Sequence, residues 1–190
     1  MVLMHTPELE LGKSMPDFKL LGVDGQYWNL NNCMGENGLV VMFICNHCPY
    51  VKSIQTKLVE DALSLKNFGV NVVAIMSNDV DEYPEDSYEN MQKIANELKY
   101  PFPYLLDSTQ ETAKKYGAVC TPDIFGLDNN SKLQYRGRLD SAGSNQTNEK
   151  LPREMVNAMQ QLVNKGKITN EQIPSMGCSI KWINNDSKIS

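Results

Sequence analysis

Cys45 and Cys48 are separated by two residues and form the only Cys-x-x-Cys pair in the chain. A pair with this spacing can close a small, reversible disulfide ring, because a thiolate is the species that attacks disulfide sulfur. His47 lies beside both cysteines, and as a cation it would stabilise a thiolate and make the disulfide more oxidising. The spacing therefore predicts dithiol–disulfide chemistry, with Cys45, Cys48 and His47 as candidate catalytic residues.

A Cys-x-x-Cys pair is also half of many structural zinc sites. The sequence has no second such pair and no paired histidines to complete a zinc site, since its other histidine is His5. We therefore predict no metal and no other cofactor, although a metal-handling or redox-sensing module stays open as the non-enzymatic alternative. We interpret the acidic stretch 79–86 as a solvated loop and helix start rather than a metal site.

The elements around the pair are predicted from hydrophobic patterning. Residues 38–44 form a continuous apolar run, which indicates a strand buried on both faces. Residues 49–68 carry apolar side chains at helical spacing, and Gly69 ends that pattern. The pair thus falls between a strand and a helix, where helix-end amides stabilise a thiolate. Pro49 suits the first helical position, which makes Cys48 the N-cap.

The rest of the chain alternates between strand and helix patterns. We expect a hairpin over 15–30, strands at 70–76, 104–106, 124–127 and 133–136, and helices at 86–98, 109–116 and 152–164. This order predicts an α/β fold with a central mixed sheet flanked by helices and an N-terminal β-hairpin. We expect one domain over 1–172 and an extended C-terminal tail over 173–190.

Composition excludes several classes of function. The 190-residue chain has a net charge of -5 and no Lys/Arg cluster, so it lacks the basic surface that nucleic acids or anionic membranes require. The longest apolar run, 39–45, is too short to span a bilayer. Residues 1–12 do not resemble a secretory signal. We therefore expect a cytoplasmic protein, in which ordinary thiols stay reduced.

Several short motifs carry a resemblance to a known family. They are Met15-Pro16-Asp17-Phe18, Cys-Asn-His-Cys-Pro-Tyr-Val at 45–51, Ser77-Asn78-Asp79, Ala-Val-Cys-Thr-Pro-Asp at 118–123, and Gly-Cys-Ser-Ile-Lys-Trp at 177–182. With these motifs the chain resembles the thioredoxin superfamily, and more closely its redoxin branch of peroxiredoxin-like (AhpC/TSA-like) proteins. The resemblance implies a thioredoxin-like fold over the domain 1–172.

The resemblance also assigns a role to Thr121-Pro122. This dipeptide matches the position where the superfamily carries a cis-proline that faces the redox pair, and a cis X-Pro bond is uncommon. It implies that Thr121 and Pro122 are substrate-binding residues, and that the backbone of Thr121 is free to pair with an extended substrate.

Two arguments from the sequence nominate different cysteines as the attacking residue. Thioredoxins use the first cysteine of the pair, which nominates Cys45. The N-cap position favours Cys48, because its sulfur then receives the strongest helix-end field. In the same register Cys48 matches the peroxidatic position of peroxiredoxins. We favour Cys48 as the thiolate and Cys45 as its partner.

A thiol peroxidase that uses Cys48 is the second enzymatic hypothesis. Peroxiredoxins place a proline and a threonine or serine ahead of the reactive cysteine, where this chain has Val41 and Cys45. The downstream arginine of that family also lacks a clear counterpart, because Arg136 and Arg138 lie later in the chain. These departures weaken the peroxidase hypothesis, although an exposed thiolate reacts slowly with peroxide.

The other three cysteines have different expected roles. Cys178 follows a break at Ile173-Pro174, so a flexible tail could bring it to the pair as a resolving thiol. Cys120 lies two residues before Pro122 and is open to a redox role or to a role as a small buried side chain. Cys33 is expected to be structural.

These observations lead to one main functional hypothesis. We expect a thiol–disulfide oxidoreductase with antioxidant activity in cell redox homeostasis. Its partners would be protein or small-molecule disulfides and thiols and a cellular thiol reductant, with no nucleic acid and no membrane. The family resemblance is also compatible with a homodimer.

Overall fold

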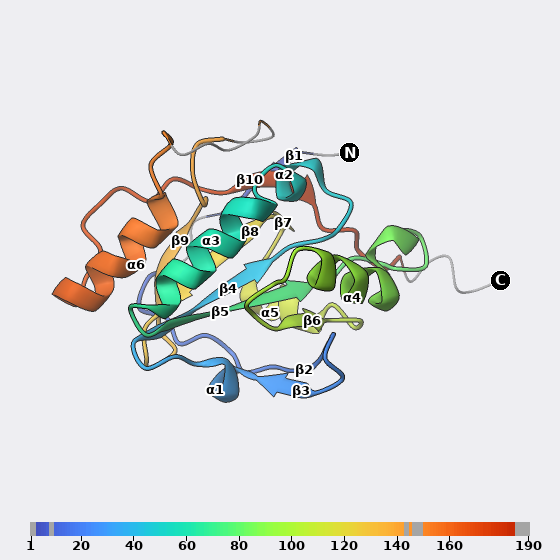
Figure 1. The fold of residues 1–190 in the computed structure, drawn as a ribbon, viewed down its shortest axis with the longest axis horizontal. Coiled ribbons are helices and arrows are strands. Elements are labelled where there is room, and N and C mark those ends of the chain that lie inside the picture. The colour runs from blue at the N-terminus through green and yellow to red at the C-terminus, as the bar shows by residue number, and fades with distance from the viewer. Residues whose placement is uncertain (1–2, 8–9, 143–144, 146–149, 185–190) are drawn as a thin grey trace.

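The computed structural model describes residues 3–7, 10–142, 145 and 150–184 (Figure 1). Within these residues, no helix is long and apolar enough to cross a membrane.

The main sheet has seven strands in the order β3-β2-β6-β5-β4-β8-β9. The strands are β2 (Lys19–Gly22), β3 (Tyr27–Asn29), β4 (Gly38–Phe43), β5 (Val70–Met76), β6 (Tyr104–Leu106), β8 (Asp123–Leu127) and β9 (Leu133–Gly137). The three central strands β4, β5 and β6 run parallel, and the outer pairs are antiparallel. The sheet is therefore mixed, as the sequence predicts, and the hairpin β2–β3 forms one side of it.

Helices cover both faces of this sheet, as the colours of Figure 1 help to trace. They are α1 (Leu30–Cys33), α2 (Pro49–Lys52), α3 (Gln55–Lys66), α4 (Tyr88–Glu97), α5 (Glu111–Tyr116) and α6 (Glu154–Lys165), together with the 3₁₀ turn η1 (Pro84–Asp86). The apolar cluster on one face contains side chains of α2, α3, α4 and α6, and the cluster on the other face contains side chains of α1 and α5. The predicted α/β fold is confirmed.

Strand β4 shows why the apolar run before the cysteines forms a central strand. All six of its residues are buried, and they alternate between the two clusters. Val40 and Met42 pack on the side of α3 and α6, whereas Val41 and Phe43 pack on the side of α5. A strand with both faces covered needs an apolar residue at every position. This strand carries the chain directly to the Cys-x-x-Cys pair.

The predicted helix over 49–68 is wrong in one respect, because the structure divides it into α2 and α3. Ser53 Oγ donates to the carbonyl of Tyr50 at 2.9 Å, and Ile54 has φ -112° and ψ -1°. A serine hydroxyl that bonds a preceding carbonyl offers the backbone an alternative to the helical ladder. The redox pair therefore precedes a single helical turn rather than a long helix.

A second sheet was not predicted. It has three strands, β1 (Leu3–His5), β10 (Met176–Ser179) and β7 (Cys120–Thr121), with β10 in the middle and both of its pairings antiparallel. The C-terminal segment is extended, as expected, but it is held as a strand between two others. Its register places Cys178 opposite Thr121.

Candidate active site

Cys45 and Cys48 lie together at the end of β4 and the start of α2. Cys48 is the N-cap of α2 and Pro49 occupies its first turn, as the sequence predicts. Both cysteines are buried, with exposed fractions of 1% and 0%. Both sulfurs contact Thr121, and each thiol lies close enough to shift the pKa of the other. The structure thus brings together the two residues on which the redox hypothesis depends.

The two sulfurs have opposite ionisation tendencies. The hydrogen bond from the Cys45 thiol is the largest influence on Cys48, and with help from Thr121 and Cys178 it outweighs burial and lowers the pKa of Cys48 to about 5. That same hydrogen bond, followed by burial and the negative charge of Asp86, raises the pKa of Cys45 well above its usual value. The arrangement favours a Cys48 thiolate that accepts a hydrogen bond from a Cys45 thiol. The neighbouring thiol, rather than a long helix, is the main cause.

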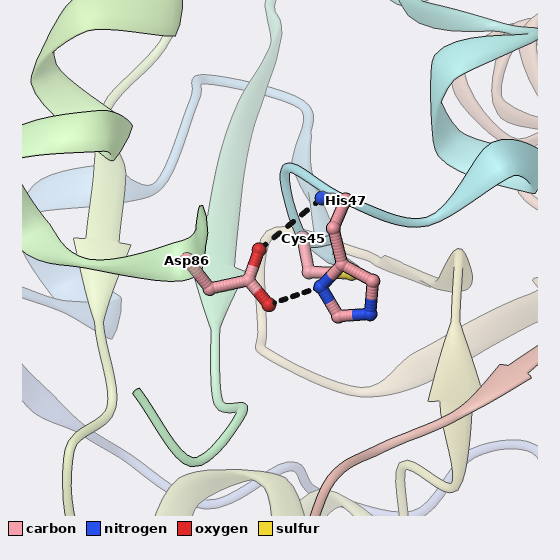
Figure 2. A group of neighbouring side chains, drawn as sticks. All are labelled: Cys45, His47 and Asp86. Atoms are coloured by element: carbon pink, nitrogen blue, oxygen red, sulfur yellow. Dashed lines mark hydrogen bonds and ion pairs between the residues drawn. The ribbon is translucent and has the colours of Figure 1, made fainter. Parts of the chain in front are cut away.

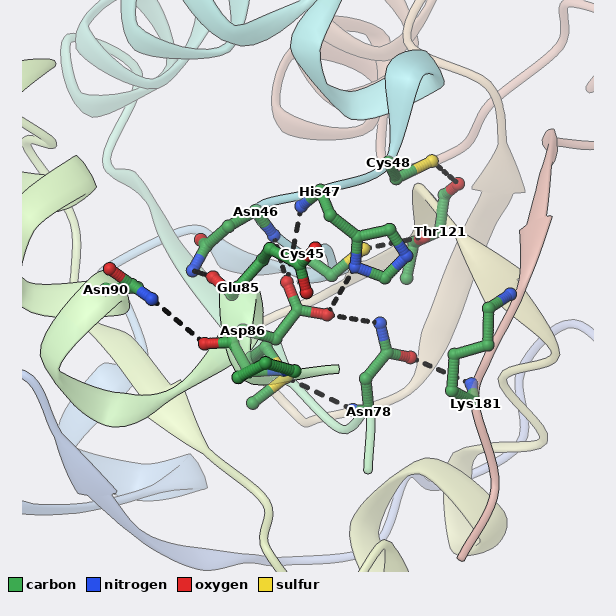
Figure 3. A network of polar contacts seen from close by, with 12 residues as sticks. Cys45, Asn46, His47, Cys48, Asn78, Glu85, Asp86, Asn90, Thr121 and Lys181 are labelled. Atoms are coloured by element: carbon green, nitrogen blue, oxygen red, sulfur yellow. Dashed lines mark hydrogen bonds and ion pairs between the residues drawn. The ribbon is translucent and has the colours of Figure 1, made fainter. Parts of the chain in front are cut away.

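The Thr121-Pro122 peptide bond is cis and lies against the redox pair, as expected. Cys45 Sγ lies 3.3 Å from Thr121 Oγ1, and Cys48 Sγ lies 3.1 Å from the carbonyl oxygen of Thr121, to which the Cys48 thiol donates while it is protonated. These contacts join the strand–helix loop to β7 across the site (Figure 3). Thr121 is the residue that touches both sulfurs.

The expectation that the backbone of Thr121 is free for an extended substrate is wrong for this conformation. Strand β10 pairs with β7 and places Cys178 directly opposite Thr121. Only 3% of Thr121 is exposed. The edge of β7 on this side is therefore occupied by the chain's own C-terminal strand, and a substrate strand could pair with Thr121 only after β10 had moved away.

His47 does not stand alone beside the cysteines, because its ring is bound to a buried carboxylate. His47 Nδ1 lies 2.7 Å from Asp86 Oδ2 (Figure 2). An ionised carboxylate only accepts, so Nδ1 carries the proton. The bond from Asp86 raises the pKa of His47 despite partial burial. Burial opposes ionisation of Asp86, but hydrogen bonds from His47 and Asn78 outweigh it and lower the pKa of Asp86.

Asp86 is the hub of a polar network that reaches the tail (Figure 3). Its Oδ1 accepts from the backbone N–H groups of Asn46 at 2.7 Å and His47 at 3.3 Å. Its Oδ2 accepts from Asn78 Nδ2 at 2.8 Å, and Asn78 Oδ1 accepts from the backbone N–H of Lys181 at 2.9 Å. The network therefore fixes the Cys-x-x-Cys loop and connects it to the residues that follow β10.

The interpretation of 79–86 as a solvated loop is wrong at its end, because Asp86 is fully buried. Asp86 and Asn78 are the site residues that the sequence analysis missed as functional groups. Asp86 lies 39 residues from His47 along the chain, so no local spacing relates them. The one available signal was the motif Ser77-Asn78-Asp79, which belongs to the family resemblance but was given no role.

A group with metal-binding potential overlaps the site. The ligand atoms of Cys45, His47 and Asp86 lie within 4.8 Å of one another (Figure 2). A thiolate, an imidazole and a carboxylate are ligands that zinc accepts. In this arrangement, however, His47 Nδ1 is bound to Asp86, and Asp86 Oδ1 already accepts two backbone N–H groups. His47 and Asp86 are thus hydrogen-bonded to each other, whereas Cys45 Sγ contacts Thr121 Oγ1.

The other three cysteines have different surroundings. Cys178 is buried in β10, opposite Thr121, and burial together with the neighbouring Cys48 raises the pKa of Cys178 to about 12. Cys120 Sγ faces the carbonyl of Pro122 at 3.5 Å, and burial raises the pKa of Cys120. Cys33 packs in the apolar cluster on the opposite face of the sheet, away from the redox pair. Its pKa is also raised by burial.

Neither arginine near the β8–β9 hairpin is directed at the redox pair. Arg136 forms an ion pair with buried Asp123 at 2.9 Å and donates to the carbonyls of Pro7 and Gly117. Arg138 forms an ion pair with Glu154 at 2.8 Å. Both guanidinium groups are thus engaged in ion pairs in this structure.

Comparisons with known proteins agree with this geometry. A family model described as AhpC/TSA family matches residues 11–136. A crystal structure of an uncharacterized conserved protein from Geobacillus kaustophilus is 46% identical, with a TM-score of 0.90 over 96% of this chain and 97% of that chain. A hypothetical protein from Sinorhizobium meliloti 1021 is 36% identical, with a TM-score of 0.87 over 94% and 98%. A search of curated proteins found no match.

More distant structures show the fold. The thioredoxin domain of a thiol-disulfide oxidoreductase from Bacteroides vulgatus is 18% identical, with a TM-score of 0.63 over 83% of this chain and 100% of that chain. At this identity the likeness concerns the backbone arrangement alone. The family match covers well over half of the sequence and includes β4, the redox pair and Thr121-Pro122. The chain therefore belongs to the AhpC/TSA family and has a thioredoxin-like fold.

Proposed function

We propose that this protein is a thiol–disulfide oxidoreductase that cycles Cys45 and Cys48 between dithiol and disulfide. The observation that carries the proposal is the placement of both sulfurs against Thr121 at the start of α2, where the pKa of Cys48 is lowered and that of Cys45 is raised. A thiolate beside a protonated thiol is the state from which disulfide exchange starts. Membership of a family of thiol oxidoreductases agrees with this assignment.

The reaction proceeds in two exchanges. The Cys48 thiolate attacks a substrate disulfide, a bond forms between Cys48 and one substrate sulfur, and the other sulfur leaves as a thiolate. Cys45 then attacks Cys48 Sγ, the bond to the substrate breaks, and the second substrate sulfur leaves with the proton of Cys45. The protein ends with a Cys45–Cys48 disulfide, and the substrate ends as two thiols once the first leaving thiolate has taken a proton from solvent. A thiol reductant reverses these steps on the protein.

His47 and Asp86 are positioning residues in this scheme. Asp86 accepts from the backbone of the redox loop, which holds that loop in one conformation. Its charge also opposes ionisation of Cys45, and this keeps the negative charge on Cys48. Once Cys48 has formed a mixed disulfide, the Cys45 proton is no longer shared with a thiolate and can be released.

A turnover assay tests the proposal. The probe is bis(2-hydroxyethyl) disulfide as substrate with dithiothreitol as electron donor, and the rate above the uncatalysed exchange is measured. We expect turnover by the wild type and by the control Cys33→Ser, and loss of turnover in Cys48→Ser. Equal rates for wild type and Cys48→Ser would overturn the assignment of Cys48.

The peroxidase alternative is tested in the same assay with hydrogen peroxide replacing the disulfide. Peroxiredoxins bind peroxide with an arginine and a threonine or serine. Here Arg136 and Arg138 are engaged in ion pairs, and Cys45 stands at the threonine or serine position. We expect disulfide turnover to exceed peroxide turnover, and the opposite ranking would favour the peroxidase.

The metal alternative rests on the close ligand atoms of Cys45, His47 and Asp86. Zinc analysis of the reduced protein separates it from the enzyme. We expect less than one tenth of an equivalent of zinc after purification without chelator, whereas one full equivalent would favour the metal module. The physiological partners proposed here are disulfide substrates and a thiol reductant in a reducing compartment such as the cytoplasm.

A further inference from the structure

Cys48 has two thiol neighbours, not one. Cys45 and Cys178 both lie close enough to its sulfur to lower the pKa of Cys48. Cys45 belongs to the same loop, whereas Cys178 arrives from β10, which pairs with β7 in the register Cys178 opposite Thr121. Because Thr121 also contacts the sulfurs of Cys45 and Cys48, the β10–β7 pairing places the third thiol at the redox pair.

The position of Cys178 is fixed by contacts on both sides of it. On the N-terminal side, a Cβ at Gly177 would clash with the carbonyl oxygen of Thr121, so the two backbones approach closely there. On the C-terminal side, Ile180 N–H donates to the Val119 carbonyl at 3.0 Å. These contacts replace the flexible connection expected from the sequence with a defined strand.

The residues after β10 anchor the strand to the site network. Lys181 N–H donates to Asn78 Oδ1, and the Lys181 carbonyl accepts from Gln110 Nε2 at 2.7 Å and from the Asp79 N–H at 2.9 Å. Asn78 in turn donates to Asp86. The strand that carries Cys178 is therefore held in register with the residues around Cys48.

We propose that Cys178 is a third redox thiol, which resolves a mixed disulfide on Cys48. This inference rests on the proposed function, because it requires Cys48 to form a mixed disulfide first. In the step itself, the Cys178 sulfur attacks Cys48 Sγ, and a Cys48–Cys178 bond forms while the bond from Cys48 to the substrate sulfur breaks. The substrate sulfur leaves as a thiol with the proton that Cys178 releases.

The step is an exchange and needs no further oxidant. The substrate disulfide is reduced to two thiols, and Cys48 and Cys178 are oxidised to one disulfide. Cys45 then attacks Cys48, which returns Cys178 to the thiol and leaves the Cys45–Cys48 disulfide. A thiol held against Cys48 by a strand has a high effective concentration, so it competes well with thiols from solution.

The test uses Cys45→Ser, which removes the neighbour in the loop and leaves Cys178. The full-length variant is incubated with glutathione disulfide, and free thiols are alkylated under denaturing conditions. Trypsin separates the relevant cysteines, because peptide 20–52 holds Cys48 and peptide 168–181 holds Cys178. We expect these two peptides to be linked by a disulfide and glutathione to be released.

Two matched double variants define the outcome. Cys45→Ser/Cys178→Ser should keep a stable glutathione adduct on Cys48, because neither neighbour remains to displace it. Cys45→Ser/Cys120→Ser should still form the Cys48–Cys178 link, since Cys120 faces Pro122 rather than Cys48. A stable glutathione adduct in Cys45→Ser with Cys178 alkylated would overturn the inference and leave the proposed function intact.

Two further results distinguish a failure of the proposed function from a failure of the role of Cys178. If Cys48 gains no glutathione in Cys45→Ser/Cys178→Ser, the proposed function fails as well. If Cys45→Ser does not fold, as judged by circular dichroism, the wild type is sampled within the first turnover instead. The transient cross-linked peptide should then appear before the Cys45–Cys48 disulfide, and its absence at every time point would count against the role of Cys178.

Discussion

His47 Nδ1 lies 2.7 Å from Oδ2 of the fully buried Asp86, which comes from η1 on the other side of the redox loop. The ring also stacks on Tyr83, with 5.3 Å between the ring centroids. Asp86 binds the backbone of the loop at the same time, so one carboxylate sets both the loop conformation and the orientation of the imidazole. The histidine of the Cys-x-x-Cys motif is therefore held by a buried carboxylate, with which it forms an ion pair when its ring is protonated.

Replacing Asp86 by Asn should remove a pH-dependent part of the stability. The raised pKa of His47 contributes stability below its usual 6.5 and loses it as the pH rises through the folded-state value. The lowered pKa of Asp86 contributes above its usual 3.8 and loses it as the pH falls through the folded-state value. The wild-type advantage over Asp86→Asn, about 1–3 kcal/mol for the unsatisfied donors, should peak between pH 3.8 and 6.5.

Denaturant unfolding of both proteins across pH 3–9 measures this advantage, and NMR titration of His47 gives its pKa directly. His47→Gln is the control, because it removes the titrating partner and should flatten the pH dependence. A wild-type advantage that is constant with pH would contradict the ion pair.

The pKa of Cys48 should depend on its two thiol neighbours in a defined order. Since the hydrogen bond from Cys45 is the largest lowering influence and that from Cys178 is smaller, Cys45→Ala should raise the pKa of Cys48 more than Cys178→Ala does. The pH dependence of alkylation by iodoacetamide measures this pKa. Cys33→Ala, on the opposite face of the sheet, should leave the profile unchanged. A larger rise in the pKa of Cys48 in Cys178→Ala than in Cys45→Ala would contradict this order and make Cys178 the main residue that stabilises the Cys48 thiolate.

Replacing Gly177 by Ala should loosen β10 from β7. The added methyl group would meet the carbonyl oxygen of Thr121, and a backbone atom of a paired strand cannot move aside without breaking the pairing. Because Cys48 is fully buried beneath this pairing, we expect its alkylation rate to increase at least tenfold. Ser179→Ala, in the same strand, is the control and should leave the rate within a factor of two. Unchanged alkylation in Gly177→Ala would mean that β10 does not cover the site.

Arg136 should contribute to stability and not to redox turnover. Arg136→Met leaves the buried carboxylate of Asp123 without its partner, which costs about 3–5 kcal/mol when a buried pair is broken. Lys115→Met removes an exposed pair with Glu111 and should cost less than about 0.5 kcal/mol. Urea unfolding compares the two variants. Disulfide turnover per folded molecule should stay at the wild-type value in both, and its loss in Arg136→Met alone would assign the arginine to the site.

The sequence patterns predicted those elements whose formation depends on residues close together in the chain. The apolar run of β4 and the cysteines before Pro49 required only strand periodicity and helix-capping rules. The break between α2 and α3 was missed because one serine hydroxyl causes it, inside an otherwise helical apolar stripe. Short strands such as β1 and β7 are too brief to show any period.

Contacts between distant segments explain the rest of what the sequence did not predict. The pairing of Cys178 with Thr121 joins residues that no repeat or spacing relates. Asp86 lies in a stretch with four other acidic residues, and composition alone assigns such a stretch to the solvent. Its carboxylate is satisfied in the interior by four donors, on Asn46, His47 and Asn78, that converge only in the folded chain.

Equilibration of the wild type in glutathione redox buffers tests the central claim most directly. The protein is poised at a series of ratios of reduced to oxidised glutathione, quenched in acid, alkylated and mapped after trypsin digestion. We predict one two-electron transition, in which Cys45 and Cys48 lose alkylation together inside peptide 20–52 while Cys33 of the same peptide stays a free thiol. Separate glutathione adducts on Cys45 and Cys48, with no disulfide between them at any ratio, would contradict the account.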